Sequence, residues 1–97
     1  MKVVLTQAAL ADLRDIGHWI ALDDPERAVT FVRELGEKCL SLAGNPLLYP
    51  SAPEIGQGVR KRRHQRYLIL YRIERDRIEI LHVVHGARDY RTLFTRI

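Results

Sequence analysis

The apolar residues of this chain change their spacing along its length, from the period of a helix to that of a strand. Between residues 7 and 43 they recur every three or four positions, which places them on one face of a helix. Beyond residue 66 they form short runs separated by charged residues, as strands do. This order predicts an α+β domain in which two helices cover one face of a sheet.

The two predicted helices follow one another closely. Asp24 is a good N-cap and Pro25 suits the first helical position, so we expect one helix over residues 7–21 and another over residues 25–43. Trp19 widens the apolar stripe of the first helix. The stripe positions are Ala9, Leu13, Ile16 and Ile20 in the first helix, and Ala28, Val32, Leu35, Cys39 and Leu42 in the second.

Four strands are predicted around this αα-hairpin. The segment 67–73 is apolar on both faces and should therefore be central in the sheet. We expect an N-terminal strand, the αα-hairpin and then a three-stranded antiparallel meander, in the order β-α-α-β-β-β, with an antiparallel sheet and residues 1–97 in a single domain. The expected strands are 2–6, 58–65, 67–73 and 78–84, with a loop over 44–58 and a hairpin turn over 74–77.

Charge is distributed unevenly along the chain. Residues 1–59 hold five Lys and Arg against eight Asp and Glu, a net charge of −3, whereas residues 60–97 hold eleven against four, a net charge of +7. This asymmetry predicts a positive surface and an acidic partner, either nucleic acid or an acidic protein segment. The chain is 46% hydrophobic, which argues against disorder. No apolar run approaches the ~18 residues that a membrane span needs, so we expect no membrane partner.

Cysteine and histidine point to no cofactor chemistry. Cys39 is the single cysteine, so no internal disulfide is possible and we expect the reducing cytoplasm. It lies on a helical stripe, which favours a core thiol over a nucleophile. His82 lies on an apolar strand and is expected to be a hydrogen-bonded core histidine. The four histidines lack ligand spacing, so we expect no metal and no cofactor.

Several short motifs follow one another in order along nearly the whole chain. They are Ala11-Asp12-Leu13-x-x-Ile16, Pro25-x-x-Ala28, a Pro-rich loop, Gly58-Val59-Arg60, Tyr67-x-Ile69-x-Tyr71-Arg72-Ile73 and Val83-Val84-His85-Gly86-x-Arg88-Asp89. In this order and at these distances they resemble the ParE-type toxins of the RelE/ParE toxin–antitoxin superfamily. No single motif is specific, and the ordered set carries the resemblance.

The resemblance implies a toxin with one of two targets. RelE-type members cut messenger RNA on the ribosome, whereas ParE-type members poison DNA gyrase. For a RelE-like endoribonuclease the candidate catalytic residues are Arg60, Arg63, His64, Arg88 and Tyr90. RelE-like toxins carry a tyrosine six residues after the arginine of the last strand, and that position here is Phe94, which transfers no proton. We therefore expect gyrase inhibition without catalytic residues.

The basic run over residues 60–66 fits two interpretations. Its charges suit a solvated edge strand that resists aggregation, and they equally suit a contact surface. Alternation sends Arg60, Arg62 and His64 to one face and Lys61 and Arg63 to the other. The expected target-binding residues are Arg60, Arg62, Arg63, Arg88, Tyr90, Leu93 and Phe94.

The resemblance also implies an antitoxin partner. We expect a ParD-like antitoxin with a ribbon-helix-helix start and an acidic tail, in a toxin2–antitoxin2 or larger hetero-oligomer. The helical hairpin and the sheet rim offer grooves for a helix and an edge for strand addition. A non-toxic relative that only binds an antitoxin is the remaining alternative. The expected antitoxin-binding residues are Leu13, Trp19, Ile20, Phe31, Leu35, Arg66 and Arg72.

Overall fold

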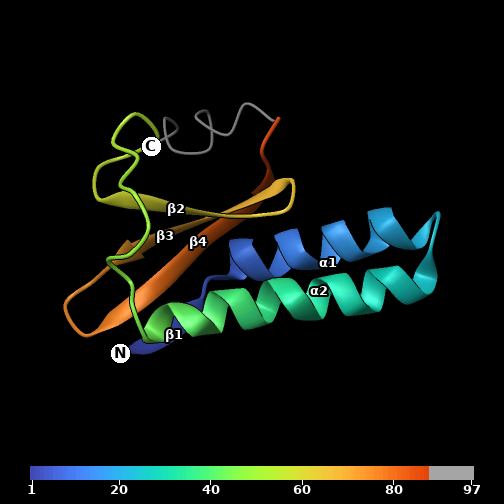
Figure 1. Cartoon of the computed structure of the whole chain (residues 1–97), viewed down its shortest axis with the longest axis horizontal. Coiled ribbons are helices and arrows are strands. Elements are labelled where there is room, and N and C mark those ends of the chain that lie inside the picture. The colour runs from blue at the N-terminus through green and yellow to red at the C-terminus, as the bar shows by residue number, and fades with distance from the viewer. Residues whose placement is uncertain (88–97) are drawn as a thin grey trace.

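The computed structural model describes residues 1–87, which form a four-stranded sheet with two helices on one face (Figure 1). The chain follows the predicted β-α-α-β-β-β order. The second helix ends earlier than expected, because its last turn tightens into a 3-10 turn. The elements are β1 (Lys2–Leu5), α1 (Gln7–Ala21), α2 (Pro25–Leu40), the 3-10 turn η1 (Ser41–Ala43), β2 (Val59–His64), β3 (Tyr67–Ile73) and β4 (Arg77–His85).

The sheet has the strand order β1-β4-β3-β2. The strand β3 lies between β4 and β2, which confirms its predicted central position. The strands β2, β3 and β4 form the predicted antiparallel meander, but β1 pairs with β4 in parallel, so the sheet is mixed and not antiparallel throughout. Apolar periodicity identifies which face of a strand is buried but carries no information on strand direction, so this pairing was not accessible from the sequence.

Side-chain caps begin both helices. The Thr6 hydroxyl accepts a hydrogen bond from the Ala9 amide at 3.1 Å, and the Asp24 carboxylate accepts one from the Arg27 amide at 3.0 Å. Such caps satisfy backbone amides that have no partner inside the helix. Between residues 1 and 87, no helix is both long enough and apolar enough to cross a membrane.

The two helices approach one another closely at Gly17. A Cβ atom placed on this glycine would lie 3.1 Å from Cγ2 of Val32, closer than nearly all real contacts. The missing side chain therefore allows α1 and α2 to pack tightly, and a larger residue here would push the helices apart.

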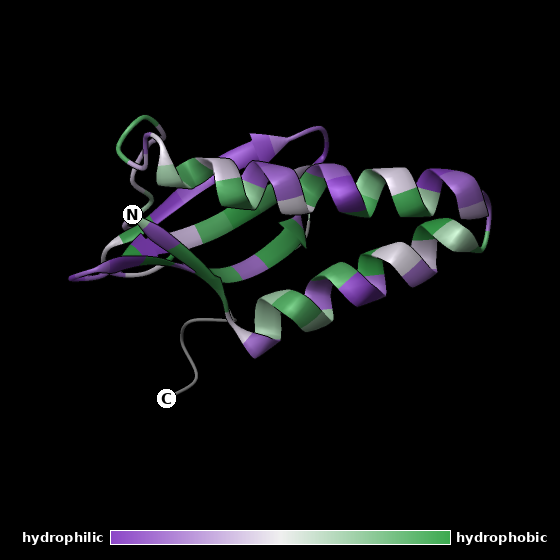
Figure 2. Cartoon of the chain, turned by 90° about the horizontal axis from the view of Figure 1, so that it is seen from below, coloured by the Kyte–Doolittle hydropathy of each residue, from purple (hydrophilic) through white to green (hydrophobic). Residues whose placement is uncertain are grey.

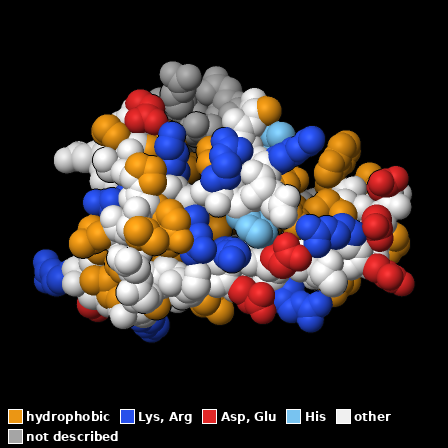
Figure 3. Space-filling view, in the orientation of Figure 1, with side chains coloured by type: hydrophobic (Ala, Val, Ile, Leu, Met, Phe, Trp, Pro, Cys, Tyr) orange, Lys and Arg blue, Asp and Glu red, His pale blue; other side chains and the backbone are white. Residues whose placement is uncertain are grey.

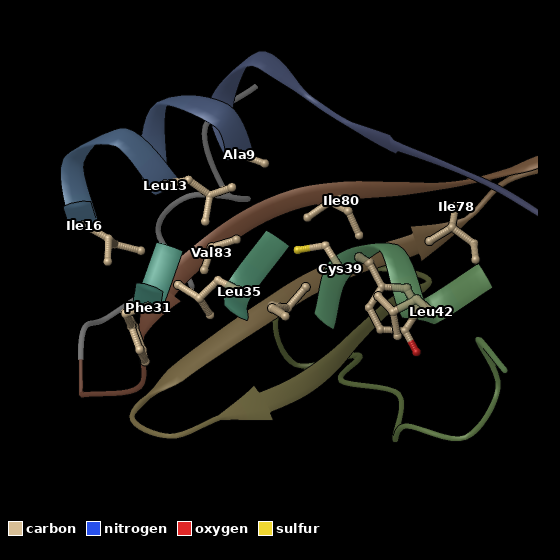
Figure 4. Packing of buried hydrophobic residues seen from close by; sticks show 12 residues of the cluster. Ala9, Leu13, Ile16, Phe31, Leu35, Cys39, Leu42, Ile78, Ile80 and Val83 are labelled. Carbon is tan, nitrogen blue, oxygen red and sulfur yellow. The ribbon is translucent and has the colours of Figure 1, made fainter. Parts of the chain in front are cut away.

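The main core fills the space between the helices and the sheet (Figure 4). The predicted helical stripes supply most of its helical side chains, including the fully buried Leu35 and Cys39. Trp19 is an exception, because its side chain is 71% exposed although it was expected to widen the stripe. The buried cluster is Ala9, Leu13, Ile16, Phe31, Leu35, Cys39, Leu42, Ile69, Tyr71, Ile78, Ile80 and Val83.

A second, smaller core lies on the other face of the sheet. It explains why β3 is apolar on both faces: Leu68 and Leu70 pack there against Ala52 and Ile55 from the long loop. The loop between η1 and β2 is thus a cover for the sheet as well as a connection. It turns into β2 at Gly58, whose φ of 75° is in the left-handed region that glycine favours.

The ladder between β3 and β4 contains an irregularity that shifts the alternation of β4. Leu70 pairs with His82 and Tyr71 pairs with Ile80, so Leu81 is an extra residue on β4. Before the bulge Ile78 and Ile80 face the helices, and after it Val83 does. The side chains of β4 beyond Leu81 therefore face the opposite side of the sheet from the one that a strict period of two would give.

Candidate partner-binding surfaces

The strand β2 is an edge strand that is almost entirely hydrophilic, in contrast to its largely hydrophobic neighbour β3 (Figure 2). The predicted alternation of its basic residues is confirmed, because Arg60, Arg62 and His64 reach α2, η1 or Tyr49 on the helix side of the sheet. Arg60 donates to the Tyr49 carbonyl at 2.7 Å. Arg62 donates to the Lys38 carbonyl at 2.9 Å and to the Ser41 hydroxyl at 2.7 Å. Two of the predicted target-binding arginines are thus engaged in holding the fold together.

The other basic residues of this region are less constrained. Lys61 lies 3.7 Å from the Glu54 carboxylate, an exposed and therefore weak pair. Arg63 is exposed and donates to the Gln65 carbonyl at 3.3 Å, and Arg66 in the β2–β3 turn is also exposed. In the view of Figure 3, Lys and Arg side chains gather over the sheet, whereas Asp and Glu side chains gather at the end of the helical hairpin. The predicted positive surface therefore exists, with Arg63 and Arg66 as its accessible arginines.

A chain of ring contacts joins α2 to the end of the sheet. The Phe31 ring stacks on His64 with 5.7 Å between centroids and contacts Tyr67 at 5.5 Å, and Tyr67 in turn meets His85 edge-on at 5.3 Å. The Arg27 guanidinium lies 4.9 Å from the Phe31 centroid. Burial raises the pKa of the Tyr67 hydroxyl above its ordinary value.

Glu34 on α2 pairs with Arg27 on the same helix and with His64 on β2. Its carboxylate accepts from Arg27 at 3.0 Å and lies 3.2 Å from Nε2 of His64. The hydrogen bond from Arg27, supported by the one to His64, lowers the pKa of Glu34 below its ordinary value. His64, a candidate proton carrier for RNA cleavage, is thus held against a carboxylate and a phenyl ring.

Two clefts open between the protruding end of the helical hairpin and the end of the sheet. The first, of about 320 Å³, is lined by Asp12, Asp15, Ile16, Trp19, Tyr67, Val83, Val84 and His85. The second, of about 350 Å³, is lined by Trp19, Ile20, Arg27, Phe31, Gln65, Arg66, Tyr67 and His85. Trp19, Tyr67 and His85 line both, so a partner that enters one cleft meets residues of the other. Exposed tryptophans beside apolar clefts are typical anchors of protein interfaces.

Sequence reasoning missed the contact between Asp12 and β4. The Asp12 carboxylate accepts from Nδ1 of His82 and from the amide of Val83, both at 2.9 Å. His82 is hydrogen-bonded, as predicted, but its side chain is 21% exposed and so lies at the margin of the core. Asp12 lies off the apolar stripe of α1, and nothing in its sequence environment distinguishes it from Asp15, which faces solvent.

The predicted antitoxin-binding residues divide by burial. Leu35 is completely buried, Phe31 is 4% exposed and Leu13 is 8% exposed, because the same apolar stripe that suggested a groove is the stripe that forms the core. Leu35 therefore has no surface to offer a partner, whereas Phe31 still lines the second cleft and Leu13 lines a groove along the hairpin. Trp19, Ile20, Arg66 and Arg72 keep exposed or half-buried surface. The predicted residues Arg88, Tyr90, Leu93 and Phe94 lie outside the described residues.

The remaining titratable groups offer no metal or nucleophile chemistry in the part of the chain that the structure describes. There, no three His, Cys, Asp or Glu side chains lie together so as to hold a metal ion. Cys39 is fully buried, and this burial raises the pKa of its thiol to about 12. The prediction of a core thiol is confirmed.

The chain thus combines a mixed sheet, a helical hairpin on one face of it and a basic edge strand. The sequence profile of the family described as the ParE toxin of the type II toxin–antitoxin system parDE matches residues 3–90. The chain belongs to this family.

Solved structures support the same assignment. The chain is similar to a component of the chromosomal ParDE toxin–antitoxin system from P. aeruginosa, with 26% identity, a TM-score of 0.77, and coverage of 88% of this chain and 95% of the other. It is also similar to a chain of the RelBE2 toxin–antitoxin complex from Mycobacterium tuberculosis, with 25% identity, a TM-score of 0.66, and coverage of 87% and 95%. No relative is found among curated proteins.

Proposed function

We propose that this chain is a toxin that inhibits DNA gyrase in the cytoplasm and is neutralised by a ParD-like antitoxin. The observation that carries the proposal is the match to the ParE toxin family over residues 3–90. The similarity to the chromosomal ParDE system of P. aeruginosa supports an antitoxin partner. We further propose that the two proteins form a toxin2–antitoxin2 or larger complex.

The environment of His64 supports inhibition without bond cleavage. Nε2 of His64 is engaged by the Glu34 carboxylate at 3.2 Å and its ring stacks on Phe31, so both contacts tie this side chain to α2. Arg60, a second member of the candidate catalytic set, donates to a backbone carbonyl. Both side chains thus form contacts within the chain. Arg63 is the accessible arginine among the predicted target-binding residues of β2, and the exposed Arg66, predicted as an antitoxin contact, lies close to it in the chain, so we now propose both for target contact.

The test is a supercoiling assay in which purified toxin is titrated into DNA gyrase. We expect inhibition near stoichiometric amounts and accumulation of cleaved DNA. The double variant Arg63→Ala/Arg66→Ala should need at least about tenfold more protein, since loss of about 1.4 kcal/mol of binding corresponds to a factor of ten. The matched control is Arg75→Ala, which removes an exposed arginine from the β3–β4 turn. Full gyrase activity at large excess of folded toxin contradicts the proposal.

The competing function is ribosome-dependent cleavage of messenger RNA, favoured by the similarity to the M. tuberculosis RelBE2 complex. Primer extension on messages after induction distinguishes the two. New 5′ ends that disappear in His64→Ala or Tyr90→Phe would establish cleavage. Intact messages together with inhibited gyrase support the proposal, and normal growth on expression without antitoxin supports a non-toxic relative.

A further inference from the structure

The turn between β2 and β3 lies beside the end of β4 (Figure 1). The Gly86 amide donates to the Arg66 carbonyl at 2.7 Å, which joins the two segments. A Cβ atom on Gly86 would lie 3.3 Å from the Arg63 guanidinium, so this side chain also lies against the glycine. Both arginines are exposed, and within residues 1–87 neither pairs with a carboxylate. Two arginines that no described carboxylate neutralises therefore flank the end of β4.

His85 adds a hydrogen-bond donor to the same place. The Ala87 amide donates to Nδ1 of His85 at 3.1 Å. A ring nitrogen that accepts a hydrogen bond carries no proton, so in the neutral ring the proton is on Nε2. The side chain is exposed and lines both clefts. Together with the two guanidinium groups, this N–H forms a donor set that suits the oxygen atoms of a phosphate.

The second cleft, of about 350 Å³, places aromatic rings next to these donors. The largely exposed Trp19 lines it from α1, and Tyr67 lines it from β3 and contacts the His85 ring edge-on. Aromatic side chains next to cations are the usual platform on which unpaired nucleobases stack. The volume is at the lower end of the range of small-ligand pockets, about 300–1,000 Å³, which suits a single base.

The charges around Trp19 differ between the two clefts. Arg27 and Arg66 line the second cleft, although Glu34, at 3.0 Å, neutralises part of the charge of Arg27. The exposed Asp15 lines the first cleft. Asp15 would repel an acidic peptide, whereas a nucleotide can direct its phosphate to the arginines and an amino group of its base to the carboxylate. This polarity favours a nucleotide over an acidic protein segment.

The faces of nucleobases are accessible in single strands and at the ends of a broken duplex, whereas an intact duplex buries them in its stack. We propose that the second cleft binds one unpaired base of single-stranded DNA, stacked against Trp19, with the adjoining phosphate held by Arg63, Arg66 and His85. The proposal rests on the proposed function for the choice of DNA, since gyrase-cleaved DNA presents base faces at the break. It adds that the toxin contacts the DNA as well as the enzyme that cleaves it.

Binding of short oligonucleotides in the absence of gyrase tests this contact. The probes are a DNA single strand of about ten nucleotides, the matching duplex and an RNA strand of the same sequence. Anisotropy of a labelled strand measures affinity, and quenching of Trp19, the single tryptophan, by unlabelled strand reports stacking. We expect the DNA single strand to quench Trp19 and to bind at least about tenfold more tightly than the duplex. Absence of binding at low salt, binding without quenching, or tighter binding of the duplex or of RNA overturns the proposal.

Substitution of the tryptophan locates the bound base. Trp19→Ala should weaken binding of the DNA single strand by about tenfold, whereas Trp19→Phe, which keeps a flat ring, should stay within about threefold of the original. Because Trp19 is largely exposed, its loss leaves the core intact. Leu48→Ala removes an exposed apolar side chain from the long loop and is the matched control. Equal affinities of Trp19→Ala and Leu48→Ala would place the strand elsewhere and overturn the proposal.

The salt dependence of binding tests the phosphate contact. Arg66→Ala should reduce the slope of log affinity against log salt concentration by about 0.7, the value for one phosphate contact on a single strand. The matched control is Arg75→Ala in the β3–β4 turn, which removes an exposed arginine and should leave the slope unchanged. If both substitutions change the slope equally, the assignment of Arg66 to the phosphate is wrong.

The outcomes also separate this proposal from the proposed function. Gyrase inhibition without oligonucleotide binding overturns the DNA contact and leaves the inhibition standing. Oligonucleotide binding without gyrase inhibition overturns the proposed function and leaves the cleft as a DNA site. If both activities are found, Trp19→Ala should need about tenfold more protein to inhibit gyrase. Undiminished inhibition by this variant would show that inhibition does not use the DNA contact, and would overturn its role in the toxin.

Discussion

The guanidinium carbon of Arg62 lies over the ring of Tyr49, 4.6 Å from its centroid. The same group donates to the Lys38 carbonyl near the end of α2 and to the Ser41 hydroxyl. A cation at this place also opposes the negative end of the helix dipole. Arg62 thus joins β2, the end of α2 and the long loop, although its position in a basic run suggested a contact with an outside partner.

Arg62→Ala should destabilise the fold by about 1–3 kcal/mol, because a cation–π contact and two hydrogen bonds are lost together. Urea unfolding followed by circular dichroism measures this free energy. The control is Arg63→Ala on the opposite face of the same strand, for which we expect a change within about 0.5 kcal/mol. Equal effects of the two substitutions would contradict the inference that Arg62 stabilises the fold while Arg63 does not.

Asp12→Ala should cost about 1–3 kcal/mol, because it leaves the Val83 amide without its acceptor and removes the partner of His82 Nδ1. Asp12→Asn keeps one acceptor oxygen and should recover part of the loss. Asp15→Ala, one turn along the same helix and exposed, serves as the control. Unfolding free energies in which Asp12→Ala and Asp15→Ala do not differ would exclude a structural role of the carboxylate.

The Cys39 thiol should resist alkylation until the protein unfolds. Burial raises its pKa from 9.0 to about 12, so at pH 8 the folded chain holds about a thousandfold less thiolate than an ordinary cysteine. Labelling with iodoacetamide, followed by mass spectrometry, measures the rate with and without denaturant. Rapid labelling of the native chain would contradict the burial of this side chain.

Stability should fall in acid partly through Glu34. Its pKa in the folded chain lies below the ordinary value of 4.5, so its contribution is complete above pH 4.5 and is lost as the pH falls through the lower folded value. Glu34→Gln should flatten the pH dependence of the unfolding free energy in this range and leave it similar at lower pH. Because Glu34 is accessible to solvent, salt should weaken the effect. Parallel curves for both proteins between pH 2 and 5 would contradict this assignment.

Local signals in the sequence accounted for much of the fold. Asp24 followed by Pro25 marked the start of α2 correctly, and the stripe that contains Leu35 and Cys39 is buried as predicted. The same signal misled at Trp19, where the helices extend past the described strands (Figure 1) and the side chain stays 71% exposed. Periodicity states which residues share a face, but not how far the opposing surface extends.

The candidate site was harder to predict from the sequence, for a related reason. The basic run was visible in the sequence, but the distinction between Arg62, which is tied to α2, and Arg63, which is not, depends on the loop and helix end that lie against one face of β2. The cleft of about 320 Å³ beside Trp19 lies where β4 continues beyond the end of β1 at Leu5. The bulge at Leu81 changes which residues of β4 face this cleft.

The sequence by itself determined the two amphipathic helices and their caps, the apolar central strand, the excess of positive charge after residue 59 and the resemblance to a toxin family. These follow from near neighbours in the chain, since helical and strand periods span only a few residues. The tertiary structure alone decided that β1 runs parallel to β4, that Asp12 reaches Val83, and which arginines stay accessible. Each of these joins residues far apart in the chain, and the pairing depends on where one element ends against another.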